Sequence, residues 1–558
     1  MGGELESASR QIRSGHLPVD GVVDYRGRPV FSRSTYGGWT SAFFIIGVEV
    51  AERFAYYGIS SNLITYLTGP LQESTASAAA NVNAWSGVSM MLPLLGGTLA
   101  DSYIGRYRTI VVASLLYVLG LAMLTLSAVS PALRPTEWRT NVYLQRCLPT
   151  QYQTVFFFFS LYLAAIAQGG HKPCVQAFGA DQFDENDPEE CKSRSSFFNW
   201  WYFGMNGGMI FTFLIVNYVQ EEVGWGLGFG IPCISMALAM VVFLVGTRSY
   251  RYCLLTSKNP FTDLAQACTR PFRKLQNQPK LDAELLFHTC SLYRAAEDWY
   301  DSRGNEEHKG ESSPGILRLF PIWASCLMHA VVFAQSSTFF TKQGSTMDRR
   351  IGPTFLIPPA ALQSFISISV VVFIPIYDRI LVPIARAFTG RPSGVTMLQR
   401  IGIGLFLSIA SIVVAALVEM KRLRTARDFG LVDLPNATIP MSLWWLVPQY
   451  VLYGASDVFA MVGLQEFFYD QMPDGLRSLG LALYLSIFGI GSFISSFLVS
   501  AIDRASRNNG DSWFSNNLNR GHLDYFYWLI TGLSSAALIF FLYFARLFHY
   551  KSKIKATV

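Results

Sequence analysis

Residues 110–126 read IVVASLLYVLGLAMLTL and residues 536–544 read AALIFFLYF, and neither stretch contains a charged side chain. A helix needs roughly 20 mostly apolar residues to cross the hydrocarbon core of a bilayer. Comparable apolar stretches recur along the whole chain. Helices packed inside a soluble protein would instead show polar positions every few residues. The chain is therefore predicted to be an all-α membrane protein.

About a dozen spans are predicted, six on each side of a long polar stretch. They lie near 41–68, 77–101, 109–128, 153–170, 197–219, 226–247, 315–341, 354–377, 395–418, 441–466, 477–501 and 524–547. Only 15% of the residues are charged, whereas soluble domains carry about a quarter. The net charge of +6 is mild, and the basic residues gather in connecting segments. That distribution indicates orientation in a membrane and excludes nucleic-acid binding as the main function.

The polar segments divide the chain into five predicted parts. They are a cytosolic amino-terminal segment (1–40), a six-helix bundle (41–247), a cytosolic linker (248–313), a second six-helix bundle (314–547) and a basic cytosolic tail (548–558). Lysine and arginine are in excess on the cytoplasmic side of membrane proteins, and the segments outside the two bundles are all basic. The residues after the ninth span are an exception, because they are basic on the predicted outer side: Lys421, Arg422, Arg424 and Arg427.

Three charged residues lie inside the first predicted span, at Glu49, Glu52 and Arg53. Positions i, i+3 and i+4 share one face of a helix, so the three side chains project together. A charge at membrane depth is costly, and it persists only when it is paired or hydrated. Two neighbouring carboxylates raise each other's affinity for a proton, while the guanidinium opposes this effect. The pattern predicts a proton-binding site; the alternative is a static salt bridge that holds helices together.

Two further charges lie at the ends of predicted spans. Lys172 follows the fourth span in the first half of the chain, and Glu466 closes the tenth span in the second half. A salt bridge between the halves that breaks and reforms would suit a carrier that opens to each side in turn. The alternative is that each residue anchors its own helix at the membrane interface.

Five stretches occur in one order: EVAERFAYYG (49–58), GGTLADSYIGRYRT (96–109), KPCVQAFGADQFD (172–184), FFNWWYF (197–203) and GLQEFFY (463–469). Together they resemble the plant nitrate and peptide transporter family. That family belongs to the proton-coupled oligopeptide transporters of the major facilitator superfamily. The resemblance implies twelve transmembrane helices in two pseudo-symmetric six-helix bundles, with a central site that opens alternately to each side.

The resemblance also implies roles for particular residues. Glu49, Glu52 and Arg53 match the family's ExxER proton-coupling motif, and Lys172 and Glu466 match its pair facing the central cavity. The inner-loop motif that latches a bundle is represented by Asp101, Gly105, Arg106 and Arg108.

Thr109 stands where the family's dual-affinity nitrate transporter is phosphorylated, and a basic residue lies three positions before it. A phosphate there would add negative charge beside the basic residues of the inner-loop motif. The alternative is that Thr109 only caps its helix, its hydroxyl accepting a free backbone N–H.

The seventh span bears on the solute. Dual-affinity nitrate transporters of the family resemble this stretch but carry a histidine where Phe333 stands, so the sequence departs from the nitrate pattern where nitrate would be held. His329 lies one turn earlier on nearly the same face and is a candidate solute contact; the alternative is a histidine satisfied within the bundle. Tyr56 and Tyr57, beside the ExxER motif, could line a pocket for a larger organic solute or serve in ordinary packing.

The predicted function is proton-coupled symport, by alternating access, of a small polar or anionic solute such as nitrate, a di- or tripeptide, a hormone or a specialised metabolite. A solute-sensing receptor or a channel on the same fold is the alternative. An enzyme is not expected, because no nucleophile–base constellation is recognisable. No CxxC or HExxH pattern occurs, so neither a metal nor a cofactor is assigned. The expected partners are the solute, protons and lipids of the plasma or vacuolar membrane, and the oligomeric state stays open.

Overall fold

The structure is a computed structural model, and it describes residues 19, 21–32, 35–134, 149–184, 187–253, 319–352, 355–390, 395–471, 477–507 and 512–548. The chain divides into two compact units. Unit one contains Met1–Lys258, Ser337–Ser367 and Asn436–Leu443; unit two contains Asn259–Ser336, Ile368–Pro435 and Trp444–Val558. The predicted parts 248–313 and 548–558 lie largely outside the described residues, and about half of 1–40 does, so the boundaries of these parts stay predictions.

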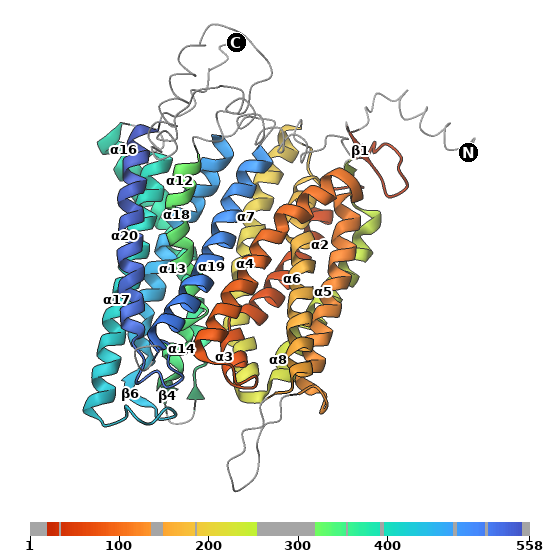
Figure 1. The fold of residues 1–558 in the computed structure, drawn as a ribbon. Helices are drawn as coiled ribbons and strands as arrows, with labels where there is room; N and C mark the ends of the chain where they lie inside the picture. Colours follow the sequence, from red (N-terminus) through yellow and green to blue (C-terminus); the bar gives the residue numbers. More distant parts are fainter. Residues whose placement is uncertain are drawn as a thin grey trace, which may run out of the picture. The chain divides into compact units, whose positions relative to one another are not determined.

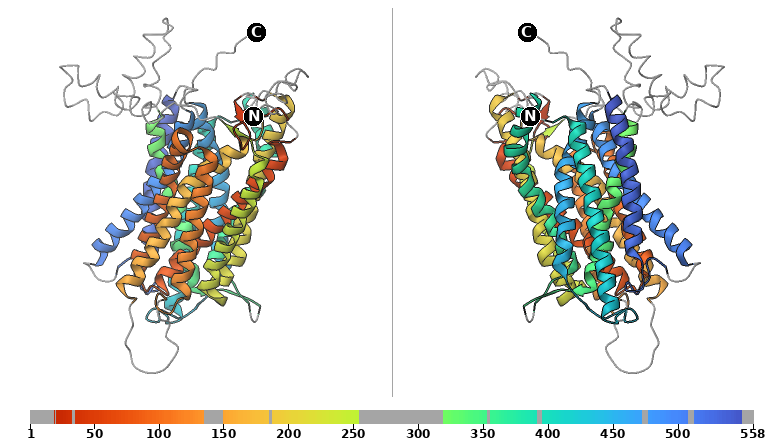
Figure 2. Two further views of the ribbon diagram at one scale, coloured as in Figure 1. Left: turned by 90° about the vertical axis from the view of Figure 1, so that its right-hand side faces the viewer. Right: turned by 90° about the vertical axis from the view of Figure 1, so that its left-hand side faces the viewer.

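Unit one is built mainly from long helices that run alongside one another (Figures 1 and 2). They are α2 (Gly38–Ser60), α3 (Leu63–Thr68), α4 (Thr75–Leu99), η1 (Ala100–Ile104), α5 (Arg106–Val129), α6 (Gln151–Ala180), α7 (Pro188–Phe211), η2 (Thr212–Val216), η3 (Val219–Val223) and α8 (Trp225–Val245), with η4 (Gly246–Arg248) at the end. The segment Ser337–Ser367 adds α14 (Phe339–Ser345) and η6 (Pro359–Gln363) and the beginning of α15 (Ser364–Ile376).

Unit two has the same helical character (Figure 1). It contains α12 (Phe320–Ser325), α13 (Leu327–Ser336), most of α15, η7 (Tyr377–Leu381), α16 (Val382–Thr389), α17 (Met397–Asp428), η8 (from Leu443 to Leu446), α18 (Val447–Asp470), α19 (Arg477–Arg507) and α20 (Leu523–Leu547). Only short strand pairs accompany the helices in the described residues. β1 (Val22–Val23) pairs antiparallel with β2 (Tyr252–Cys253), β3 (Met347–Asp348) pairs parallel with β6 (Ile439–Ser442), and β4 (Arg350–Ile351) pairs antiparallel with β5 (Phe355–Leu356).

Polar residues at the expected positions start several of these helices. The Ser74 side chain accepts a hydrogen bond from the Ser77 amide at the start of α4. Thr150 and Gln153 form a reciprocal capping box on α6, and Thr396 and Gln399 form the same arrangement on α17. Such caps satisfy amide groups that have no partner within the helix, which fixes where each helix begins.

All twelve predicted spans fall on helical segments of the described chain. Seven helices in that part are long and apolar enough to cross a membrane by length and composition. The helices of spans one, two, five, seven and ten fall outside the seven, and each has a local reason. α4, in the second span, is rich in small and polar residues. α2 carries charged side chains at its centre, α7 begins in a charged stretch, and α18 carries acidic side chains. The seventh span is divided among α12, α13 and α14.

The helix that contains the ninth span is longer than the predicted span. The residues after position 418 were expected to form an outer basic segment, but α17 continues through them to Asp428. Arg422 is fully buried there and forms an ion pair with Glu419 (Nη2 to Oε1, 2.6 Å). The Arg422 side chain therefore neutralises a carboxylate inside the protein, and it does not add to the surface charge that orients a membrane protein.

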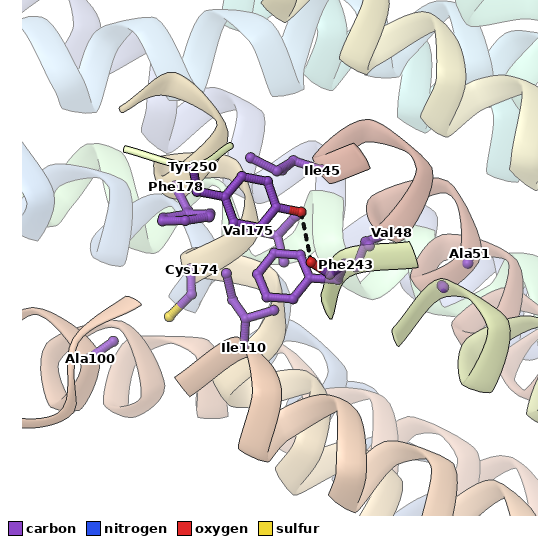
Figure 3. Packing of buried hydrophobic residues seen from close by; sticks show 11 residues of the cluster. Ile45, Val48, Ala51, Ala100, Ile110, Cys174, Val175, Phe178, Phe243 and Tyr250 are labelled. Atoms are coloured by element: carbon purple, nitrogen blue, oxygen red, sulfur yellow. Dashed lines mark hydrogen bonds between the residues drawn. The ribbon is translucent and has the colours of Figure 1, made fainter. Parts of the chain in front are cut away.

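Buried hydrophobic side chains fill the space between α2, α5, α6 and α8 in unit one (Figure 3). Phe178, Phe243 and Tyr250 pack edge to face or tilted, and the Tyr250 hydroxyl donates to the Phe243 carbonyl at 3.0 Å. Next to this cluster the fully buried Arg251 holds Glu190 through two hydrogen bonds of 2.6 and 3.0 Å. These contacts hold the residues just before β2, Tyr250 and Arg251, against α8 and α7.

Glycines allow some helices to touch backbone to backbone. A Cβ atom at Gly96 of α4 would overlap the carbonyl of Gly169 on α6, and one at Gly404 of α17 would overlap the backbone of Ala460 on α18. Close approach of this kind is common between membrane helices, where dispersion contacts drive association. Gly404 therefore serves the packing of α17 against α18.

We expect Gly404→Ala to lower the stability of the protein by about 1–3 kcal/mol, because α17 and α18 would have to move apart. Gly532 of α20 is the matched control, since a Cβ atom there meets nothing within 4 Å. Gly532→Ala should leave stability unchanged or raise it, because alanine favours the helix. Thermal unfolding of both variants in detergent measures the difference. Equal stability of the two would contradict the packing described.

Candidate functional site

The charged residues predicted in the first span meet on α2 in unit one. Arg53 Nε lies 3.3 Å from Glu49 Oε1, and Arg53 Nη2 contacts Glu52 Oε2. All three residues are buried, with exposed fractions of 4% or less. Glu49 Oε2 and Glu52 Oε1 have no hydrogen-bond partner among the described residues. Carboxylate oxygens in such a place can hold an added proton without breaking an existing hydrogen bond.

α6 brings two more side chains to this cluster. A ring nitrogen of His171 and one carboxylate oxygen each of Glu49 and Glu52 lie within 4.8 Å of one another. His171 is fully buried, and neither ring nitrogen has a hydrogen-bond partner in the described protein. Lys172 interacts electrostatically with both carboxylates, and its Nζ lies 3.6 Å from the sulfur of Met90. We refer to Glu49, Glu52, Arg53, His171 and Lys172 as the charge cluster.

With both carboxylates ionised and His171 neutral, two negative charges face two positive charges. Protonation of one carboxylate would leave a net positive charge in a buried place. A buried charge is costly unless a partner of opposite sign arrives. A proton on the charge cluster would therefore be held more easily when a negative group lies beside it.

Glu49, Glu52 and His171 also have the donor types of a metal site. Arg53, however, already contacts both carboxylates. A divalent ion would have to displace this guanidinium and would then lie beside Lys172 as well. We therefore assign no metal to the cluster.

Aromatic rings surround Arg53. Tyr56 stacks on Trp85 with 5.5 Å between centroids, and the Arg53 guanidinium lies 5.8 Å from the Tyr56 ring centroid. Tyr57 packs edge to face on Tyr56 at 5.1 Å and is only half buried. The fully buried Tyr117 of α5 interacts electrostatically with Glu52 and Arg53. The sequence offered no signal for Trp85 or Tyr117, because tyrosine and tryptophan in a span are usually packing residues.

His329 and Phe333 lie on one face of α13 in unit two, as their spacing predicts. Both pack against the rings of Tyr453 of α18 and Phe488 of α19. The centroid of the Tyr453 ring lies 5.6 Å from that of His329 and 5.8 Å from that of Phe333. The centroid of the Phe488 ring lies 6.2 Å from that of His329 and 5.9 Å from that of Phe333. Asp457 of α18 is the partner that the sequence reading missed, with Oδ1 3.6 Å from His329 Nε2. An acidic residue inside the predicted span 441–466 was the signal that could have found it.

Glu466 has a partner within unit two. Its Oε2 lies 3.7 Å from Nη1 of Arg400, and the Glu466 side chain is 49% exposed. The Arg400 guanidinium in turn lies over the Tyr377 ring at 4.3 Å. Lys172 belongs to unit one and Glu466 to unit two, so a pairing between them stays a prediction.

The inner-loop motif surrounds the break between η1 and α5. Gly105 has φ +88°, a conformation that other residues rarely adopt, and it precedes the first residue of α5. Arg106 Nη1 donates to both carboxylate oxygens of Asp181, at 2.8 and 2.6 Å, and so joins the start of α5 to the end of α6. Asp101 lies in η1, and Arg108 is exposed.

Thr109 differs from its expected capping role. Its hydroxyl donates to the Gly105 carbonyl at 3.0 Å, and Gly105 occupies the cap position, so Thr109 does not accept a backbone N–H. The residue is buried, with an exposed fraction of 8%. A kinase could reach the hydroxyl only after this first turn of α5 opens, and phosphorylation of Thr109 stays a prediction.

Three contacts join the segment Ser337–Ser367 to the other helices of unit one. Lys342 Nζ donates to Thr68 Oγ1 at 3.0 Å, and Gln363 Nε2 donates to the Ser61 carbonyl at 2.8 Å. Arg349 Nη1 lies 2.8 Å from Glu221 Oε2. Side-chain contacts of this kind can break and reform without unfolding a helix.

An open groove of about 620 Å³ lies along α2, α7 and α8. Its lining is glycine and apolar side chains, together with Ser235, and contains no charged residue. Such a surface suits acyl chains of lipids better than a polar solute.

Residues 107–514 match the POT family (PTR2). Protein NRT1/PTR FAMILY 5.10 of Arabidopsis thaliana is 58% identical over 537 residues, which cover 94% of this chain and 95% of that protein. Protein NRT1/PTR FAMILY 5.14 of the same plant is 51% identical, with 96% and 97% covered.

Solved structures show the same fold. An auto-inhibited POT family peptide transporter superposes with a TM-score of 0.70 at 22% identity, covering 93% of this chain and 99% of that one. A POT family transporter in complex with 5-aminolevulinic acid gives 0.64 at 16% identity, with 92% and 98% covered. The predicted fold class, an all-α membrane protein of the major facilitator type with two six-helix bundles, is confirmed. The family match and the extent of the NRT1/PTR similarity show that this chain is a multi-pass membrane transporter of the POT family, in its NRT1/PTR branch, and not an enzyme.

Proposed function

We propose that this protein is a proton-coupled symporter, and that the charge cluster of unit one holds the coupling proton. The carrying observation is the buried arrangement of two carboxylates against Arg53 and Lys172, with His171 unpaired beside them. A static salt bridge would add little stability, because the desolvation of the buried charges offsets most of their attraction.

The proposed cycle follows from the charge balance. A proton enters and neutralises Glu49 or Glu52, so the bond from that carboxylate to Arg53 weakens. Arg53 or Lys172 is then free to attract a negative group of the solute. Loss of the proton on the other side of the membrane restores the ion pair and expels the negative group. Proton and solute thus move together because each removes the electrostatic penalty of the other.

Latches that hold one state of unit one are proposed at two places. Arg106 and Asp181 join α5 to α6, and Arg349 and Glu221 join the segment Ser337–Ser367 to η3. Alternating access requires contacts that form in one state and break in another. The exchangeable ion pairs named here meet that requirement.

We propose a small organic solute with a negatively charged group. Phe333 stands where the nitrate transporters of the family carry histidine, and it packs against the buried rings of Tyr453 and Phe488. The Phe333 ring itself is only partly buried, and an aromatic ring favours contact with carbon-rich solutes. The solved neighbours include a peptide transporter and a complex with 5-aminolevulinic acid, both compatible with this class. A proton gradient across either the plasma or the vacuolar membrane would drive the transport.

Uptake into oocytes tests the proposal. Labelled nitrate, a labelled dipeptide and labelled 5-aminolevulinic acid are offered together and singly, at acidic and at neutral outer pH. We expect accumulation of an organic tracer above the level of water-injected oocytes at acidic pH, and little at neutral pH. Uptake that ignores the pH gradient would instead favour a channel.

A further inference from the structure

A second group of titratable side chains is buried in unit two, away from the charge cluster in sequence and on different helices. His329 of α13 faces Tyr453 and Asp457 of α18. The Asp457 Oδ1 to His329 Nε2 distance is 3.6 Å, and the Tyr453 hydroxyl lies 3.4 Å from the same nitrogen. Exposed fractions are 1% for His329 and Tyr453 and 7% for Asp457. The proposed coupling at Glu49 and Glu52 makes no use of these residues.

The ion pair of Glu419 and Arg422 in the same unit has shorter and more numerous hydrogen bonds than the group of His329, Tyr453 and Asp457. Arg422 is held by bonds of 2.6–2.8 Å to Glu419, Asn519 and the Leu518 carbonyl. His329 Nδ1 and Asp457 Oδ1, in contrast, have no hydrogen-bond partner among the described residues. A pair retained for stability would be expected to satisfy its polar atoms, because each unsatisfied one costs free energy. The open atoms and the 3.6 Å separation leave room for a change of state.

The surroundings of the pair are aromatic and contain few other charges. Phe488 and Tyr484 of α19 pack on the side of His329 and Tyr453. Cys326, at the end of α12, is buried and accepts the His329 amide through its carbonyl. On α17 and α20, which also pack against α13, the buried titratable groups Glu419, Arg422 and Tyr527 interact with one another.

The charge of the pair depends on one proton. With neutral His329 and ionised Asp457 the buried site carries one negative charge. An added proton makes the pair neutral overall, and the two side chains can then close to a charge-assisted hydrogen bond of about 2.7–2.9 Å. The proton comes from water and returns to it, and no other bond changes. Closure would draw α13 and α18 together where Phe333 packs against Tyr453.

We propose that His329 and Asp457 form a second proton-binding site, separate from the charge cluster, whose occupancy sets the position of α13 against α18. The site rests on the proposed function for its role in transport, but its proton binding can be measured without a solute. It predicts that two protons, and not one, act on the transport cycle.

The test counts the protons that the purified full-length protein takes up between about pH 8 and pH 5, the window in which histidine normally titrates. We expect His329→Gln and Asp457→Asn each to lower the count by about one proton per molecule. The double variant should also lose about one, because the two side chains share a single proton. An ordinary aspartate titrates below this window, so a loss in Asp457→Asn reports the shared proton.

His522 is the matched control, because its Nδ1 also lies 3.6 Å from a carboxylate, Asp524, but its side chain is 35% exposed. His522→Gln should add its loss to that of His329→Gln. An unchanged count in both His329→Gln and Asp457→Asn, with both variants folded by thermal unfolding, would overturn the second site. If each single variant loses one proton and the double variant loses two, His329 and Asp457 bind separate protons, and the proposal that they share one is overturned.

The outcome is separable from that of the proposed function. If Glu49→Gln and Glu52→Gln abolish pH-driven uptake while His329→Gln leaves the proton count unchanged, only the second site is wrong. If the count falls as expected but uptake by the wild type ignores pH, only the proposed symport is wrong. We also expect the rate of solute uptake to depend on about two protons in the wild type and on about one proton in His329→Gln, as judged from how steeply the rate changes with outer pH.

Discussion

Glu49→Gln and Glu52→Gln should each reduce acid-driven uptake to the background level while the protein still reaches the membrane. Glutamine keeps the shape of glutamate and can form hydrogen bonds, but it cannot gain or lose a proton in this pH range. In either variant Arg53 also loses one of its two carboxylate partners, so the charge cluster is fixed in a state that resembles the protonated one. Tracer uptake at acidic and neutral outer pH, normalised to the amount of protein at the surface, measures the effect.

Glu73 offers the control for these substitutions. It is a partly buried glutamate of unit one that accepts a hydrogen bond from Asn81 at 2.9 Å, and it lies outside the charge cluster. Glu73→Gln should keep most of the pH-driven uptake. Full accumulation at acidic pH in both Glu49→Gln and Glu52→Gln would show that neither carboxylate holds the coupling proton.

Arg422→Ala should cause the largest loss of stability in unit two, about 3–5 kcal/mol, because it leaves the buried Glu419 carboxylate without its partner. The same change removes the hydrogen bonds from Arg422 to Asn519 and to the Leu518 carbonyl, which hold the end of α17 against the residues before α20. Thermal unfolding in detergent gives the measurement.

Two comparisons define this effect. Arg424 lies on the exposed side of α17, and Arg424→Ala should change stability little. The double variant Glu419→Leu and Arg422→Leu should be less damaging than Arg422→Ala alone, since it leaves no unpaired charge. Equal unfolding temperatures for Arg422→Ala and Arg424→Ala would contradict the ion pair.

The helices could be predicted from the sequence because lipid imposes a length and an apolar composition on each span. Each of the twelve predicted spans overlaps one or more helices in the described residues. The helix that contains the ninth span continues past the predicted span, to Asp428. Glu419 lies one turn before Arg422 on the same helix, but Asn519, which also bonds Arg422, comes from far along the chain and could not be found from the local sequence.

The candidate site could be predicted only in part. Glu49, Glu52 and Arg53 are neighbours on one helix, so local spacing was enough to bring them together. His171 and Asp457 could not be given partners in this way, because their neighbours come from helices far away in sequence. Asp181 posed the same difficulty, since nothing in the local pattern connects it to Arg106. Charged and polar residues inside apolar spans were the useful signal, and Asp457 shows that each of them merits a search for a partner.

The central claim is that the movement of solute and proton is linked at the charge cluster. Purified protein in liposomes that contain a pH-sensitive dye tests it most directly. At the start the solute that accumulates in oocytes is more concentrated outside the liposomes than inside, and the pH is the same on both sides. The account predicts that the solute gradient alone drives protons inward and acidifies the interior in the wild type, and that Glu49→Gln and Glu52→Gln abolish this acidification. Solute entry without any acidification in the wild type would contradict the account.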